Sequence, residues 1–264
     1  MLMPGSREKA MRRTNAVRGA LGVLVLAIGL LPEMAAATIS LSATRVIVHG
    51  KEREGGLIVS NQDPLPALVQ AWVDDGRPEQ APETIATPFQ LLPPLVRIEP
   101  KGNQRIRVLV VRPELLPADK ESLYWLNVVE VPRKEAGAED ASATGAPDFG
   151  AQLKVVVRTR LKLIHRPAGL KGEPADGVAR LEWRSSADGR RLSISNPSLW
   201  VINLASIAPT GLIENAVLGD GSIAPQATRT FELARPVQAG QAIEFEWVDD
   251  HGVARKARAV VRPR

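Results

Sequence analysis

The chain of 264 residues contains no cysteine, one tyrosine and three histidines. Without cysteine there can be no disulfide, thiolate metal site or thiol nucleophile, so each folded unit must be stabilised by the packing of its core. His49, His165 and His251 lie far apart, and the sequence has no helical zinc motif, nucleophile elbow or phosphate-binding loop. We therefore expect a protein that is not an enzyme and that binds neither a cofactor nor a metal.

Two short polar segments have more than one interpretation. Asp249, Asp250 and His251 could bind a metal, but two aspartates before His-Gly are more typical of a hairpin turn. Residues 219–221, Gly-Asp-Gly, lack the rest of a dinucleotide-binding motif and lie among predicted strands. We interpret both segments as turns.

Positive charge is not concentrated in the folded part of the chain. Five of the 34 basic and two of the 29 acidic residues precede residue 38, so the remainder has 29 basic and 27 acidic residues, a formal charge of +2. These charges are interleaved, and the sequence has few aromatic residues on which bases could stack. We expect no nucleic-acid partner.

The first 37 residues have the layout of a secretory signal peptide. Four basic residues lie between positions 9 and 18, an apolar run covers residues 20–31, and three alanines occupy positions 35–37. A membrane anchor is the alternative interpretation, but a spanning helix needs about 20 apolar residues and this run is shorter. We predict cleavage after Ala37, export, and no stable membrane insertion.

The rest of the chain shows the pattern of an all-β protein. Polar and apolar residues alternate in residues 105–110, 191–194 and 242–247, and Gly, Asp, Asn and Pro separate such segments. No segment after residue 38 predicts a helix of three or more turns. The length allows two sandwiches, with a boundary near the Pro-Ala-Gly of residues 167–169.

The longest predicted strand covers residues 153–165. One face is apolar and the other carries Lys154, Arg158, Arg160 and Lys162. Such a strand can be an ordinary sandwich strand that is buried on one side. It can also be an edge strand that offers its apolar row to a partner, with cations that discourage unwanted pairing or capture an anion. Residues 133–150, which precede it, contain almost no large apolar residue, so we expect a loop there.

Several segments, in this order along the chain, resemble the periplasmic pilus chaperones of the PapD-like family. They are residues 44–50 (TRVIVHG), 71–73 (AWV), 85–88 (IATP), 93–100 (PPLVRIEP), 121–127 (ESLYWLN), 162–167 (KLIHRP) and 194–197 (ISNP). The resemblance covers most of the chain after the leader. It implies a signal peptide in residues 1–37, followed by two immunoglobulin-like β-sandwich domains, 38–166 and 167–264, joined at an angle.

The resemblance also implies a mechanism and partners. Chaperones of this family bind fimbrial subunits in the periplasm, complete the subunit's open sandwich with their long strand, and deliver subunits to an outer-membrane usher. By register, the donor residues here are Leu153, Val155 and Val157. Arg45 and Lys162 match the pair that binds the subunit's C-terminal carboxylate in the cleft between the domains.

A second set of matching positions implies an ion network between the domains. Its members are Glu121, Arg166, Asp250 and Arg107, and its role is to fix the domain angle. One geometric question is open: alternation places Lys162 on the face opposite Val155 and Val157. The strand must therefore twist strongly, or Lys162 must reach the cleft from the other face.

Two other classes of protein fit the sequence less well. A secreted structural fimbrial subunit or adhesin should show one sandwich and a free, alternating N-terminal extension, whereas this chain enters its first strand soon after the leader. A periplasmic hydrolase or sugar-binding protein should show clusters of polar and aromatic residues, which are absent from the sequence.

Overall fold

The computed structural model describes residues 39–132, 156–210 and 218–263. The predicted signal peptide of residues 1–37, the predicted loop of residues 133–150, and Leu153 and Val155 lie outside the described residues. Within the described part of the chain, no helix is long and apolar enough to cross a membrane.

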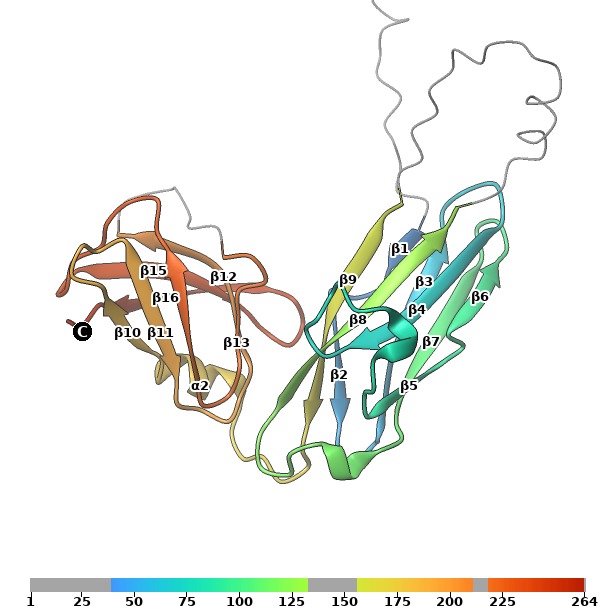
Figure 1. The fold of residues 1–264 in the computed structure, drawn as a ribbon, viewed down its shortest axis with the longest axis horizontal. Helices are drawn as coiled ribbons and strands as arrows, with labels where there is room; N and C mark the ends of the chain where they lie inside the picture. The colour runs from blue at the N-terminus through green and yellow to red at the C-terminus, as the bar shows by residue number, and fades with distance from the viewer. Residues whose placement is uncertain (1–38, 133–155, 211–217, 264) are drawn as a thin grey trace, which may run out of the picture. The chain divides into compact units, whose positions relative to one another are not determined.

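The described residues up to Arg166 form one β-sandwich (Figure 1). Its four-stranded sheet has the order β1 (Ile39–Leu41), β3 (Glu54–Asn61), β7 (Asn103–Val110), β5 (Phe89–Leu92). Its five-stranded sheet has the order β2 (Arg45–His49), β9 (Arg158–Arg166), β8 (Ser122–Val131), β4 (Ala67–Asp74), β6 (Leu95–Ile98). Two single-turn 3-10 helices, η1 (Pro82–Thr84) and η2 (Pro113–Leu115), lie between strands.

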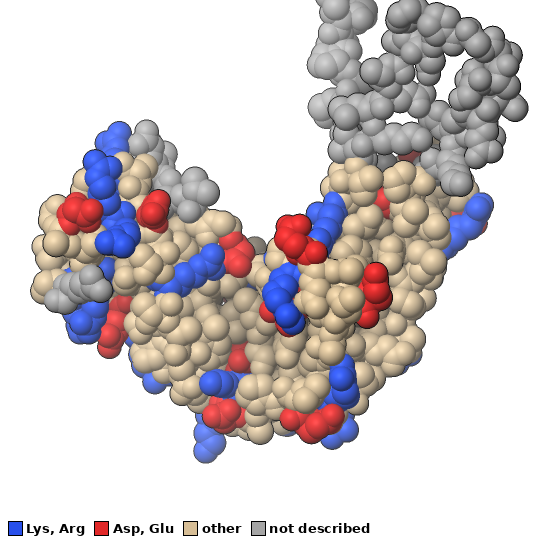
Figure 2. Space-filling view, viewed as in Figure 1, with Lys and Arg blue, Asp and Glu red and all other residues tan. Residues whose placement is uncertain are grey.

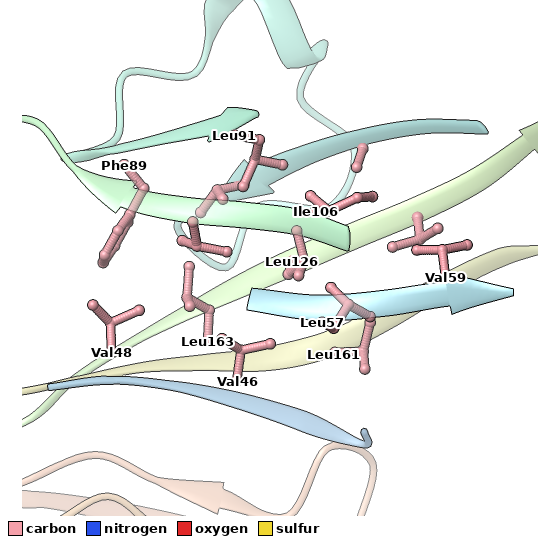
Figure 3. Close-up of a cluster of buried hydrophobic side chains, with 14 of the residues drawn as sticks. Val46, Val48, Leu57, Val59, Phe89, Leu91, Ile106, Leu126, Leu161 and Leu163 are labelled. Atoms are coloured by element: carbon pink, nitrogen blue, oxygen red, sulfur yellow. The ribbon is translucent and has the colours of Figure 1, made fainter. Parts of the chain in front are cut away.

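The core of this sandwich follows from the alternation of apolar residues in its strands. Figure 3 shows the inward-facing side chains, among them Val46, Leu57, Ile106, Leu126 and Leu163, all of which are buried. Each such side chain contributes roughly 1.5–3 kcal/mol by leaving water. Since no disulfide is present, this packing holds the two sheets together.

Among the described residues, Val156 and Val157 lie outside the long strand, although the sequence pattern placed them in it. We expected it to begin at Leu153, but β9 begins at Arg158; Val156 and Val157 precede it and are exposed. Leu161 and Leu163 point into the core, so this part of the strand is an ordinary sandwich strand. Its ladder with β8 ends at Arg158, and without a paired neighbour a chain has no hydrogen bonds that define a strand.

The strand β9 is paired on both sides over only half its length. It runs parallel to β2 over Lys162–Arg166, and Arg45 is the Cα partner of Lys162. It runs antiparallel to β8 from Arg158 to His165. Among the described strands, none pairs with the other side of residues 158–161. An open edge therefore adjoins the β2–β9 pair.

The second sandwich also has two sheets. One has the order β10 (Glu182–Ser185), β11 (Arg191–Asn196), β14 (Ala227–Glu232). The other has the order β13 (Ser222–Ile223), β12 (Ile202–Pro209), β15 (Ala242–Val248), β16 (Ala254–Val260). A six-residue helix, α2 (Pro174–Ala179), follows the predicted boundary at residues 167–169 and is capped by Glu173 and Asp176. The all-β, two-domain prediction is confirmed; among the described residues, the structure adds this short α-helix and the two single-turn 3-10 helices to it.

Candidate functional site

Two cations lie side by side at the β2–β9 pair. Arg45 and Lys162 are register partners on neighbouring parallel strands, which lie about 4.8 Å apart. The Lys162 Nζ donates to the backbone carbonyl of Asp220 (2.5 Å), and the Arg45 Nη1 donates to that of Val248 (3.2 Å). The Arg45 Nε is buried and has no hydrogen-bond partner.

The electrostatics of this pair favour a bound anion. Burial, with the neighbouring charge of Arg45, lowers the pKa of Lys162 from 10.5 to about 8. Burial also lowers the pKa of Arg45, although Asp250 and Asp249 oppose the effect. Like charges on adjacent strands repel each other, and no ion pair joins either cation to a described carboxylate. A carboxylate placed between them would relieve this repulsion and satisfy the free Nε.

The side chain of Lys162 lies on the outer face of its sheet. Lys162 lies on the face opposite the buried Leu161 and Leu163, with its Nζ 5.8 Å from the Trp125 ring centre. The cation therefore reaches the site from the outer face of the sheet, as alternation predicts. No strong twist of β9 is needed to place it there.

Two further cations of β9, Arg158 and Arg160, are held by groups that the sequence pattern did not predict. Arg160 stacks 4.2 Å from the Trp125 ring centre and bonds to Asp74 (2.5 Å). Arg158 lies 4.9 Å from the Trp72 ring centre. The Asp74 side chain is fully buried, and Arg160 lowers its pKa against the effect of burial. Asp74 is the last residue of β4, and no signal in the sequence marks it as a partner of these arginines.

Three members of the expected ion network come together. Arg166 Nε donates to Glu121 Oε1 (2.6 Å), and the two Nη atoms of Arg166 donate to the Asp250 carboxylate (2.6 and 2.9 Å). Glu121 Oε2 accepts the N–H of Val201 (2.7 Å). The Trp200 ring centre lies 4.9 Å from the guanidinium of Arg166. Residues 121 and 166 of the first sandwich are thereby bonded to residues 201 and 250 of the second.

Burial shifts the ionisation of this network. Burial raises the pKa of Glu121, against the effects of Arg166 and the N–H of Val201. Burial lowers the pKa of Arg166, but Asp250 and Glu121 outweigh it and the pKa is raised. Both oxygens of Glu121 accept hydrogen bonds, which favours the ionised carboxylate.

Arg107 is not part of this network, which corrects the sequence-based expectation. It lies on β7 and forms a two-pronged pair with Glu54 of the neighbouring strand β3 (2.8 and 2.7 Å). Register explains the pairing, because Arg107 lies opposite Gly56, two residues from Glu54 on the same face. Its side chain is 47% exposed, so the pair is a surface ion pair.

The alternative metal site at residues 249–251 is a hairpin turn between β15 and β16. Asp249 accepts the N–H groups of His251 and Val253 (3.0 and 2.9 Å), and Gly252 has a left-handed φ of 83°. Among the described residues, no three histidine or acidic side chains gather in a way that could hold a metal. On the face shown in Figure 2, basic and acidic side chains are interspersed and form no continuous basic stripe.

Of the three predicted donor residues, Val157 lies within the described part of the chain. Val157, the residue before β9, is 66% exposed. It directly precedes the open edge of residues 158–161, so an apolar side chain and a free strand edge occur together.

Family comparisons cover nearly the whole chain after residue 37. Residues 38–171 match the family "Pili and flagellar-assembly chaperone, PapD N-terminal domain". Residues 176–259 match "Pili assembly chaperone PapD, C-terminal domain". Both domains occur, in the order of the family, whereas a structural subunit would not account for either match.

Individual relatives agree with the family matches. The chaperone protein MrkB of Klebsiella pneumoniae is 33% identical over 226 residues, 85% of this chain and 91% of the relative. The chaperone protein FimB/FhaD of Bordetella pertussis is 33% identical over 253 residues, 92% and 98% of the two chains.

Solved structures show the same similarity in three dimensions. The Salmonella enterica SafB chaperone, solved in complex with the SafA pilin, has a TM-score of 0.69 at 28% identity and covers 86% of this chain and 98% of its own. The Pseudomonas aeruginosa CupB2 chaperone has a TM-score of 0.64 at 30% identity and covers 84% and 100%. Sequence, fold and domain order together show that this chain belongs to the PapD-like family of pilus-assembly chaperones.

Proposed function

We propose that this chain is a periplasmic chaperone that captures fimbrial subunits through their C-terminal carboxylate and completes their fold with its own strand. Arg45 and Lys162 bind the carboxylate. Val157, with Leu153 and Val155 in the segment before it, supplies apolar side chains to the open core of the subunit. Strand addition satisfies the backbone of the subunit's edge, and the alternate side chains fill its pockets.

One observation carries this proposal: a repelling pair of cations lies where the open edge of β9 begins. An anion held by Arg45 and Lys162 fixes where a bound chain starts, and the open edge gives that chain hydrogen-bonding partners. A slip of one residue would turn every apolar side chain to the wrong face. The anchor therefore sets the register of the added strand.

The proposal extends to location, partners and chain organisation. Residues 1–37 are a signal peptide, residues 38–166 a donor-strand domain and residues 167–264 a second domain. An outer-membrane usher receives the captured subunit, and the protein acts by binding, without catalysis. The two family matches support this division, because one ends at residue 171 and the other begins at residue 176. Mass spectrometry of the periplasmic protein should show Thr38 as its first residue; an uncleaved leader in a membrane fraction would contradict it.

Co-expression with a fimbrial subunit tests the anchor. Arg45→Ala and Lys162→Ala should each abolish co-purification, because a bond to a charged partner contributes roughly 1.5–3 kcal/mol and the remaining cation cannot compensate the carboxylate. Arg107→Ala removes a cation from another surface and is the matched control. If either anchor variant folds and still retains the subunit as Arg107→Ala does, the assignment is wrong.

A further inference from the structure

A tight turn of the second sandwich brings a backbone carbonyl to Lys162. Gly219 and Gly221 have left-handed φ angles of 58° and 61°, which side chains rarely adopt. A Cβ on Gly221 would lie 1.9 Å from the carbonyl oxygen of Leu204, and the backbone of Gly221 bonds to Leu204 (2.8 Å). The conformation of the turn therefore favours glycine on both sides of Asp220.

Asp220 faces two different cations. Its backbone carbonyl accepts the Lys162 Nζ (2.5 Å), and its carboxylate Oδ1 accepts the Arg229 Nη1 and the N–H of Ser222 (2.9 Å). Arg229 is itself held in place, because Nη1 also donates to the carbonyl of Ser222 (2.8 Å) and the guanidinium lies 5.2 Å from the Phe231 ring centre. Arg229 thus binds the carboxylate of Asp220 while Lys162 binds only its carbonyl.

The carboxylate of Asp220 is close enough to Lys162 to compete with the subunit's carboxylate for this cation. Its carboxylate acts on Lys162 electrostatically, and so does the charge of Arg229 with the opposite sign. A carboxylate on the same chain has an effective concentration that a separate subunit cannot match. If the Asp220 side chain turned to Lys162, it would occupy the cation that the subunit's carboxylate needs.

We propose that Arg229 is a positioning residue for the carboxylate anchor: it holds the Asp220 carboxylate away from Lys162 and so leaves Lys162 open to an incoming carboxylate. The inference rests on the proposed role of Lys162 in subunit binding. It assigns a function to a residue on β14 that need not touch the subunit. It also gives the Gly-Asp-Gly turn a role beyond reversing the chain.

A double-mutant cycle with a defined probe tests the inference. The probe is a synthetic peptide of alternating valine and serine with a free C-terminal carboxylate, and the same peptide amidated at its C-terminus measures binding without the anchor. Arg229→Gln should weaken binding of the acid peptide by on the order of fivefold, the effect of one competing exposed ion pair. Asp220→Asn alone gives the binding against which the double variant is compared. Adding Asp220→Asn to Arg229→Gln should restore binding, because the competitor is then gone.

A readout that needs no peptide separates this role from a merely structural one. Nuclear magnetic resonance of the lysine side chain should show the pKa of Lys162 rising above about 8 in Arg229→Gln, since a cation is removed and the acid is released toward Lys162. If Arg229→Gln does not fold, Arg229→Met, which also removes the positive charge, replaces it, and the same rise in pKa and the same rescue by Asp220→Asn are required. An unchanged pKa, or no rescue, overturns the inference.

Lys162→Met separates a failure of the Arg229 positioning role from a failure of the carboxylate anchor. If Lys162→Met loses the acid peptide while Arg229→Gln binds it normally, the positioning role is wrong and the anchor stands. If Lys162→Met binds the acid peptide as tightly as the unchanged protein, the anchor itself is wrong.

Discussion

Substitution of Glu121 by glutamine should destabilise the protein more than substitution of Asp250 by asparagine. Both carboxylates bind Arg166, but the Glu121 side chain is fully buried and that of Asp250 is 31% exposed. Glu121 uses one oxygen for Arg166 and the other for the N–H of Val201. A glutamine has one acceptor oxygen for these two donors, so one of them loses its acceptor.

The magnitude follows from these contacts. A buried donor without a partner costs about 1–3 kcal/mol, and replacing a charge-assisted bond by a neutral one costs about 1 kcal/mol more. We therefore expect Glu121→Gln to lower the free energy of unfolding by about 3 kcal/mol. Water can replace the lost bond at the partly exposed Asp250, so Asp250→Asn should cost about 1 kcal/mol.

Urea unfolding followed by circular dichroism measures both variants under the same conditions. The difference of about 2 kcal/mol exceeds the usual error of the extrapolation when the slopes agree. An equal loss in the two variants, or a greater loss in Asp250→Asn, would refute the reasoning that burial decides the cost. A changed slope in only one variant would show that it alters how the two sandwiches unfold together.

Three further predictions concern single groups. Subunit affinity should fall about tenfold per pH unit above pH 8, where free Lys162 loses its proton, and Lys162→Arg should flatten this profile in a binding titration. Burial lowers the pKa of His165, so the unfolded chain takes up a proton at a higher pH than the folded chain does. The free energy of unfolding should therefore fall as the pH drops below about 6.5. Urea unfolding at each pH should show a smaller fall in His165→Gln. Asp74→Asn should lower the free energy of unfolding by about 3–5 kcal/mol in the same assay, because Arg158 and Arg160 lose a buried carboxylate; a loss below 1 kcal/mol would show that the two cations are adequately solvated without it.

The alternation of side chains predicted the sheets well, because a strand that is buried on one face alternates apolar and polar residues. Leu161 and Leu163 were expected on one face and Lys162 on the other, and the structure has them so. The start of β9 was not predictable in this way. The apolar row continues to Leu153 in the sequence, but a strand needs a hydrogen-bonded neighbour, and alternation does not identify neighbours.

The contacts that bring distant residues together were the hardest to predict. Arg45 and Lys162 were assigned to one site through the family resemblance, since nothing in composition or spacing pairs β2 with β9. Arg107 was assigned to the wrong partners because its true partner, Glu54, depends on the register of β3 and β7. The roles of Asp74 and Asp220 were missed because the sequence does not show which cations a carboxylate will bind.

The parallel pairing of β2 with β9 also has a consequence for the timing of folding. Arg45 and Lys162 come from the two ends of the first sandwich's sequence, so their pairing closes the largest loop in that domain. Contacts between remote segments form late, after local hairpins have formed, because closing a long loop costs more entropy. In a molecule that has not finished folding, β2 and β9 are not paired, so Arg45 and Lys162 cannot hold a carboxylate between them. Competence to assist another protein would thus arise only in chains whose own folding is complete.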